Sequence, residues 1–259
     1  MIMYCKICGG KEEKTFQTKI LDKYNVDYYY CTNCGFLHTE EPHWMEEAYK
    51  SPIDPRDTGV LVRNIAFSRT TAVLLYFLFD RHGKYVDYAG GYGIFTRLMR
   101  DIGFDFSWYD LYAQNLLAKG FEYNQEIKDI ELITSFESFE HFVDPVHEME
   151  KMVTLSKSIF FSTSILPLPP PNPGDWDYYG FNHGKHISFY SVKTLEIIAG
   201  KFGLTLYTNG TDTHLFTTKR LNDKLFRLLL KCSYAGLFWL VKGTMKSKTL
   251  DDSKALDGK

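Results

Sequence analysis

The sequence contains no long hydrophobic run and no surplus of positive charge. No uninterrupted stretch reaches the ~18 apolar residues that span a bilayer, and the residues after Met1 lack the apolar centre of a secretory signal. We therefore expect a cytoplasmic protein. The chain has 30 Lys and Arg against 32 Asp and Glu, a formal net charge of −2. Without a basic surplus to hold a phosphate backbone, a nucleic-acid partner is disfavoured.

Cysteine is scarce, and four of the five cysteines form two CxxC pairs, Cys5 with Cys8 and Cys31 with Cys34. Each pair is followed by glycine, which suits a tight turn that lets backbone amides face thiolate sulfur. In a reducing compartment such pairs are more typical of metal ligands than of disulfides. Four thiolates from two turns predict a closed, tetrahedral zinc site. Free thiols or a redox pair are the alternatives.

The length of 259 residues, 44% of them hydrophobic, permits one large core with a small appendage. We expect a zinc-ribbon module over residues 1–42, with a hairpin between its two CxxC turns. Residues 43–220 are predicted to form one α/β domain, which opens with lead-in helices interrupted at Pro52 and Pro55. Residues 221–259 are predicted to form a C-terminal helix followed by a disordered tail beyond about residue 246.

From residue 84 onward, strand and helix patterns alternate. Strands are expected at 84–89, 106–110, 132–138, 158–165, 204–210 and 214–220, and helices at 94–103, at 112–120, after Pro145 and at 191–203. This alternation predicts a Rossmann-like, doubly wound α/β fold, with a mainly parallel sheet closed by an antiparallel edge strand. In such sheets ligands bind beyond the carboxyl ends of the strands, where the strand order reverses.

A nicotinamide dinucleotide site would carry GxGxxG, but here Gly91 and Gly93 are followed by Thr96. The segment VDYAGGYG offers instead an acid near a strand end, Asp87, followed by a glycine turn that lets backbone N–H groups approach a ligand. A second acid, Asp110, ends the next expected strand, where a carboxylate would accept two ribose hydroxyls.

Four ordered segments, VDYAGGYG, WYDLY, LITSFESFEH and GFNHGKHISFYS, resemble the class I S-adenosylmethionine-dependent methyltransferases, in the group with an N-terminal zinc ribbon that often acts on sugars. The resemblance covers the chain from Cys5 to about Arg220. The family's loop has glycine where this chain has Ala89, a small residue that still permits close approach. The resemblance implies a cofactor site of Asp87, Ala89, Gly90, Gly91, Gly93, Asp110, Leu111, Phe136 and Glu137.

Methyl transfer from a sulfonium is an in-line displacement, so the protein mainly holds donor and acceptor in place. A general base is needed only for a protonated acceptor, and the candidates are His141 with Glu140, then His186. Alternatively, Glu140 and His141 cap the helix that starts near Pro145. His183 and His186 could also suit a metal, but the sequence shows no clear third ligand.

The proline-rich insertion at residues 166–187 is the most substrate-like segment. Trp176, Tyr178 and Tyr179 supply flat faces and Asp175 and Asp177 supply acceptors, a combination that suits a lid over a polar ring such as a sugar. The three aromatic residues and His183 are the substrate-binding candidates. The alternative is a rigid surface loop whose aromatic residues serve packing.

The predicted function is S-adenosylmethionine-dependent methylation of a sugar, a nucleotide-linked sugar or a small glycan precursor. RNA or protein methylation is a second hypothesis, although the chain lacks an NPPY- or DPPY-like tetrapeptide. A non-catalytic scaffold subunit is the third. The apolar, lysine-containing stretch at 221–245 predicts either a packing or dimerisation helix or a peripheral membrane contact. The acceptor atom and the oligomeric state are not determined by the sequence.

Overall fold

The computed structural model describes residues 3–50 and 57–257. The chain divides into two compact units. The first holds described residues 3–50, 137–154 and 161–218, and the second holds 57–136, 155–160 and 219–257. This division differs from the expected domains, because residues 1–42 share a unit with much of the later chain. The predicted break at Pro52 and Pro55 lies outside the described residues.

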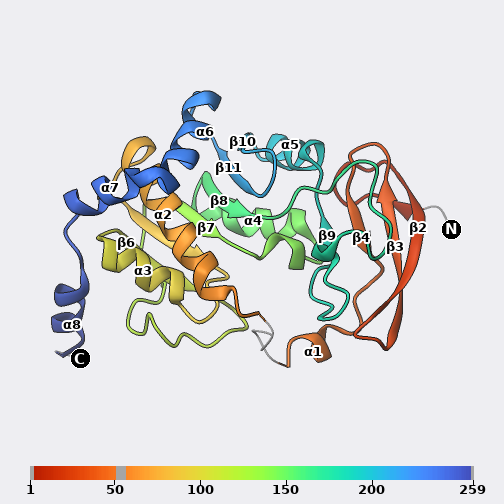
Figure 1. Cartoon of the computed structure of the whole chain (residues 1–259), viewed down its shortest axis with the longest axis horizontal. Helices are drawn as coiled ribbons and strands as arrows, with labels where there is room; N and C mark the ends of the chain where they lie inside the picture. Colours follow the sequence, from red (N-terminus) through yellow and green to blue (C-terminus); the bar gives the residue numbers. More distant parts are fainter. Residues whose placement is uncertain (1–2, 51–56, 258–259) are drawn as a thin grey trace. The chain divides into compact units, whose positions relative to one another are not determined.

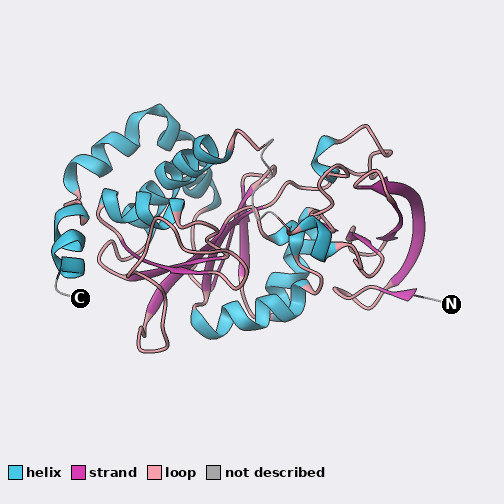
Figure 2. Ribbon diagram, turned by 90° about the horizontal axis from the view of Figure 1, so that it is seen from below, coloured by secondary structure: helices cyan, strands magenta, loops and turns pink. Residues whose placement is uncertain are grey.

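The first unit contains a five-stranded antiparallel sheet in the order β1 (Met3–Tyr4), β2 (Lys11–Ile20), β3 (Tyr24–Cys31), β4 (Leu37–Thr39) and β9 (Ser188–Phe189). The predicted hairpin is confirmed, since β2 pairs with β3 out to the turn after Ile20. The register shifts between Lys14 and Phe16. Such irregularities increase twist and bend the strand, and the hairpin is visibly curved in Figure 2. β9 joins the end of the 166–187 insertion to this sheet.

Helices α1 (Met45–Ala48), α4 (Pro145–Leu155) and α5 (Val192–Lys201) complete the first unit. Ser191 caps α5 in a capping box, because its hydroxyl accepts the Thr194 N–H. The same hydroxyl donates to the Cys34 carbonyl at 2.7 Å. The start of α5 is therefore tied to the second CxxC turn, 157 residues earlier.

A six-stranded sheet has the order β10-β11-β8-β7-β5-β6. Its strands are β5 (Lys84–Tyr88), β6 (Asp105–Tyr109), β7 (Ile130–Ser135), β8 (Ser158–Ser162), β10 (Thr205–Thr208) and β11 (Thr213–Thr217). β5 pairs in parallel with β6 on one side and β7 on the other, and β10 and β11 form the expected antiparallel edge. The protein thus has the predicted α/β fold with a mixed, Rossmann-like sheet. The strand order reverses at β5, which places the ligand-binding edge there.

Helix α3 (Ile94–Ile102) follows β5 as predicted, but the helix predicted at 112–120 is wrong. The backbone N–H groups of that segment bond elsewhere: those of Leu116 and Leu117 donate to the Tyr92 carbonyl, and that of Ala118 donates to the Asn115 side chain. These bonds replace the repeating pattern of a helix. The segment is a folded loop.

Helix α2 (Val60–Leu78) is long and apolar enough to cross a membrane by length and composition, although no such segment was expected. It contacts α3, α6 (Asp223–Cys232) and α7 (Phe238–Thr244) within the second unit (Figure 1). Ser68, Thr70 and Thr71 on it are buried, and the Thr70 hydroxyl lies 3.2 Å from that of Ser233. In this structure the second half of α2 is buried in the second unit, whereas Leu61 and Val62 near its start are exposed.

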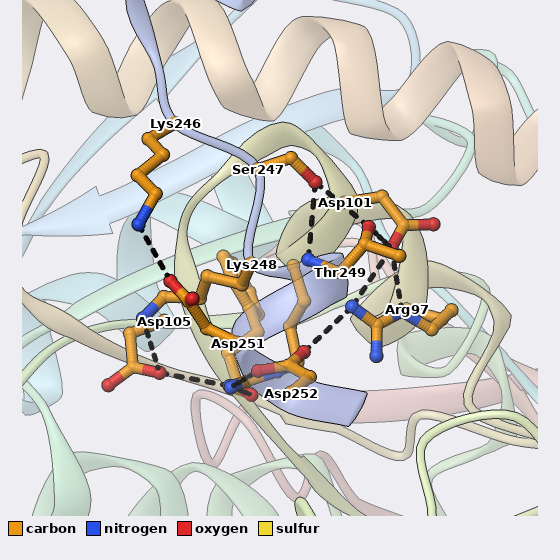
Figure 3. A network of polar contacts seen from close by, with 11 residues as sticks. Arg97, Asp101, Asp105, Lys246, Ser247, Lys248, Thr249, Asp251 and Asp252 are labelled. Carbon is orange, nitrogen blue, oxygen red and sulfur yellow. Dashed lines mark hydrogen bonds and ion pairs between the residues drawn. The ribbon is translucent and has the colours of Figure 1, made fainter. Parts of the chain in front are cut away.

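Residues beyond 246, expected to be disordered, include helix α8 (Thr249–Asp257). Its Asp252 is buried and accepts hydrogen bonds from Arg100 at 2.7 and 2.8 Å and from Arg97 at 2.8 Å. Around this pair, Thr249 donates to Asp101 and Lys246 pairs with Asp251 (Figure 3). Charge-assisted bonds of this kind are short and strong, and they fasten α8 to α3.

Candidate functional site

The turn after β5 is shaped by three residues with positive φ: Ala89 at 58°, Gly91 at 53° and Gly93 at 82°. A Cβ on Gly90 would lie 2.7 Å from Asp87 Oδ2, and one on Gly93 would lie 2.8 Å from Asn115 Oδ1. Those two glycines are needed for packing inside the protein. By contrast, a Cβ on Gly91 would meet nothing within 4 Å. The backbone of Gly91 therefore faces open space, as a ligand-binding turn requires.

Asp87 is buried beneath this turn. The hydroxyls of Thr96 and Thr134 donate to its two oxygens at 2.9 and 3.1 Å. Burial, together with the nearby Asp110 charge, raises the pKa of Asp87 to about 7, against the lowering effect of the two hydroxyls. A positively charged ligand group above the turn would favour the ionised form.

Asp110 lies directly after β6 and faces the same turn. Its Oδ2 accepts the Gly91 N–H at 2.9 Å, and its Oδ1 accepts the N–H groups of Tyr112 and Ala113 at 2.7 and 2.8 Å. Trp108 strengthens the corner by donating its indole N–H to the Gly91 carbonyl. The carboxylate is thus held in one orientation, with one acceptor site of Oδ2 left over for a ligand. Leu111 beside it is 61% exposed.

The last two predicted cofactor residues follow β7, one in each unit. Phe136 stacks on Phe67 at 4.3 Å and meets the edges of Phe95 and Phe160. Glu137 has a φ of 52°. Ser162 accepts its backbone N–H and donates back to its carboxylate. A non-glycine residue held in this conformation marks a strained corner.

A polar cluster in the first unit brings together the three predicted catalytic side chains. One donor atom from each of Glu140, His141 and His186 lies within 4.8 Å of the others. His186 Nδ1 lies 2.6 Å from the Tyr178 carbonyl. That carbonyl can only accept, so Nδ1 carries the proton in this contact. The potential metal ligands that the structure brings together are thus Glu140, His141 and His186, and the pair of His183 and His186 considered from the sequence is not the set that converges.

The surroundings of His141 keep it neutral. Burial lowers the pKa of His141 well below its ordinary value, and His186, His183 and Lys185 lower it further. Two neighbours were missed by sequence reasoning: the Tyr49 ring, 6.0 Å away, and buried Lys185. Lys185 could have been found, because it stands between the two predicted histidines, whereas Tyr49 carried no signal. The His141 imidazole is therefore neutral in this setting and keeps a lone pair on one ring nitrogen.

The aromatic residues of the 166–187 insertion divide between this cluster and the core. Tyr178 lies 4.7 Å from His186, ring to ring, and its hydroxyl lies 3.3 Å from that of Thr163. Tyr179 is only 1% exposed and stacks on Phe181, so its predicted role in substrate binding is corrected to packing. Trp176 packs against Tyr179 and Phe189.

The insertion is fixed to the hairpin side of the first unit. The Trp44 indole donates to the Gly184 carbonyl at 2.8 Å, and the Leu21 N–H donates to the Phe181 carbonyl. A Cβ on Gly184 would lie 2.6 Å from Ile20. The alternative reading, a packed surface loop, therefore describes this structure better than a free lid.

The four paired cysteines converge at one point in the first unit. Cys5 and Cys34 sulfurs lie 3.6 Å apart, those of Cys8 and Cys31 3.5 Å, and all four lie within 4.8 Å. These separations are close to the ~3.8 Å edge of a tetrahedral zinc-thiolate site and far longer than a disulfide bond. The Gly10 N–H and the Asn33 amide point at Cys8 and, against the effect of burial, lower its pKa to about 7. The donor set fits zinc.

A family model described as a methyltransferase domain matches residues 62–209, more than half of the chain. The chain belongs to this methyltransferase family. With its acid-glycine-acid site at the end of β5, it is an S-adenosylmethionine-dependent methyltransferase of class I. No curated protein matches the chain.

Several solved structures resemble the chain weakly. They include OxaC (15% identity, TM-score 0.46, 66% of this chain and 50% of that one) and TnmH (11%, 0.45, 69% and 62%). Human N-acetylserotonin methyltransferase in complex with SAM is a third (13%, 0.42, 68% and 66%). This chain therefore spans less than two thirds of the length of each. Likenesses with TM-scores below 0.5 do not establish a shared chemistry.

Proposed function

We propose that this protein transfers a methyl group from S-adenosylmethionine to a hydroxyl or activated carbon of a sugar, a nucleotide-linked sugar or a small glycan precursor. The observation that carries the donor half is the link between Gly91 and Asp110 at the switch point of the parallel strands. S-adenosylmethionine, when bound, supplies an electrophilic methyl group on a sulfonium.

The cofactor-facing residues have separate tasks in this proposal. Asp110 would bind the ribose through the acceptor site left on Oδ2, because its carboxylate is already oriented by three backbone N–H groups. Asp87 would face the amino acid portion. The open side of Gly91 would admit the ligand backbone.

For the acceptor half, the proposal rests on the cluster of His141, Glu140 and His186 with Tyr178. His141 is neutral and would take the proton from a hydroxyl of the sugar acceptor. Glu140 would stabilise the imidazolium that forms. Hydroxyl-rich acceptors suit this cluster, because tyrosine, histidine, glutamate and lysine side chains meet there.

We further propose that the four cysteines hold one structural zinc ion. The ion would lock the two CxxC turns together, and with them the start of α5, through the bond from Ser191 to the Cys34 carbonyl. Free cysteines at these positions fit the reducing cytoplasmic location expected from the sequence.

The test uses methyl-labelled S-adenosylmethionine with a panel of nucleotide-sugars, for the wild type and for His141→Asn. We expect label transfer to at least one sugar, a fall of about 10²–10⁴-fold in turnover for the variant, and unchanged cofactor binding. His147→Asn is the matched control, because His147 is exposed on α4 and pairs only with Glu150 among the described contacts. If His141→Asn turns over as fast as the wild type, His141 is not the general base. Transfer to RNA or protein but to no sugar would replace the acceptor class.

A further inference from the structure

The segment from Lys224 to Lys242, which comprises most of α6, the turn after it and the first part of α7, has two sharply different sides. Its inner side packs within the second unit, where Phe226, Leu229, Phe238 and Val241 are buried. The Arg69 guanidinium of α2 lies 5.6 Å above the Phe238 ring and 5.8 Å from that of Trp239. The segment is therefore folded onto the protein rather than projecting from it.

The outer side of this segment is apolar where solvent exposure would favour polar residues. Trp239 is 61% exposed, Leu240 60% and Leu228 55%. On α6 the exposed residues recur at helical spacing along one face. Scattered exposed apolar residues are ordinary, but several large ones on one continuous segment mark an interaction surface.

The same side carries charge of one sign. Between residues 224 and 250 the sequence contains no Asp or Glu, although the chain as a whole has a net charge of −2. Within the described residues no ion pair engages the exposed cations of this segment, which are Lys224, Arg227, Lys231 and Lys242. The surface is thus a local basic patch that alternates with large apolar side chains.

The path of the chain keeps both helices on the surface. Ala235 and Gly236 leave helical geometry, and Gly236 has a φ of 104°. The resulting bend separates α6 from α7, and neither is long enough to cross a bilayer. The Lys242 ammonium lies 5.6 Å from the centre of the Trp239 ring, so a cation and an indole lie next to each other on this face.

We propose that this face, Lys224 to Lys242, binds in the plane of an anionic lipid membrane. Exposed tryptophan, tyrosine and leucine would enter the boundary between headgroups and acyl chains, while lysine and arginine would meet lipid phosphates. A nucleic-acid partner would use the cations but not the exposed leucines. A second copy of the chain would meet an equally basic surface.

The experiment is cosedimentation of the full-length protein with phosphatidylcholine vesicles, with and without phosphatidylglycerol. We expect binding that depends on the anionic lipid and weakens with salt. Each cation replaced by alanine should lower affinity about fivefold, and Leu228→Glu should lower it at least ~tenfold. Fluorescence of Trp239 should shift to shorter wavelength with vesicles and be quenched by brominated lipid. Trp44, Trp108 and Trp176 are all more buried.

Matched controls lie on α8, where Leu250 is 75% exposed and Lys254 is exposed. Leu250→Ala and Lys254→Ala should bind vesicles like the wild type, and all variants should keep their thermal unfolding temperature. Absence of binding to anionic vesicles at low salt would overturn the proposal. Vesicle binding that Leu228→Glu leaves unchanged would also overturn it, as would RNA that competes the vesicles off the protein. A dimer in analytical sedimentation that Leu228→Glu converts to monomer would overturn it as well.

Discussion

The backbone N–H of Gly91 donates to the carboxylate of Asp110 at 2.9 Å, which joins the turn after β5 to the end of β6. The two residues belong to parallel neighbours in the sheet. This one hydrogen bond therefore fixes the position of the glycine turn and the orientation of the Asp110 carboxylate. The predictions below follow from this corner and from the groups that support each unit.

Gly91→Ala should weaken S-adenosylmethionine binding at least ~tenfold, because its Cβ would fill the open side of the turn. Its φ of 53° also makes alanine strained by about 1 kcal/mol. Gly203→Ala isolates that strain, since Gly203 has a φ of 67° and equally open surroundings in the first unit. Calorimetric titration and thermal unfolding of both variants check this. Equal cofactor affinity in the two would contradict it.

Asp87 should make stability fall as pH rises. Its folded-state pKa of about 7 exceeds the ~3.9 of an unfolded aspartate, so between these values the folded chain keeps a proton that the unfolded chain releases. In that window wild-type stability should drop relative to Asp87→Asn by up to about 1.4 kcal/mol per pH unit. Below pH ~4 and above ~7 the difference should be constant. Urea unfolding of both proteins from pH 4 to 8 measures it, and parallel curves would refute the assignment.

Cys31→Ser should remove the zinc ion and destabilise the first unit, because a three-thiolate site cannot close the tetrahedron. Elemental analysis of protein purified without chelator should find one zinc per chain for the wild type. Cys232→Ser should keep the metal, since Cys232 lies on α6 in the other unit. Wild-type protein without zinc would rule out the metal site.

Asp252→Asn should destabilise the second unit by roughly 3 kcal/mol, because it strips the main partner from the buried Arg100 guanidinium. Against the effect of burial, Arg100 and Arg97 hold the pKa of Asp252 below its usual range. The neighbouring Asp251→Asn is the control, since Asp251 pairs with exposed Lys246 (Figure 3). Unfolding by urea should separate the two variants, and equal midpoints would disprove the anchoring of α8.

The sequence was sufficient to predict those elements whose structure is determined by neighbouring residues in the chain. The strand-turn-helix around Asp87, the hairpin at β2 and β3 and the edge pair β10 and β11 were all predictable, because hydrophobic alternation and turn residues specify them. The convergence of four cysteines followed from spacing alone.

Prediction from the sequence failed where a residue's structure depends on a partner far away in the chain. α8 looked too polar to be ordered because its partner Arg100 lies 152 residues away. Tyr179 looked like a sugar-stacking residue because nothing local shows that Phe16 and Tyr28 of the hairpin pack against it. The 112–120 segment has the composition of a helix, but its backbone N–H groups donate to the Tyr92 carbonyl and the Asn115 side chain instead of forming helical bonds.

The most direct test of the cofactor claim is titration calorimetry of the wild type and Asp110→Ala with S-adenosylmethionine and S-adenosylhomocysteine, with NAD as the control. We predict micromolar binding of the first two ligands, no binding of NAD, and a loss of about ten- to a hundredfold in the variant, since hydrogen bonds to a charged group contribute ~1.5–3 kcal/mol. Wild-type protein that binds neither sulfur ligand, or that binds them equally well without Asp110, would contradict the account.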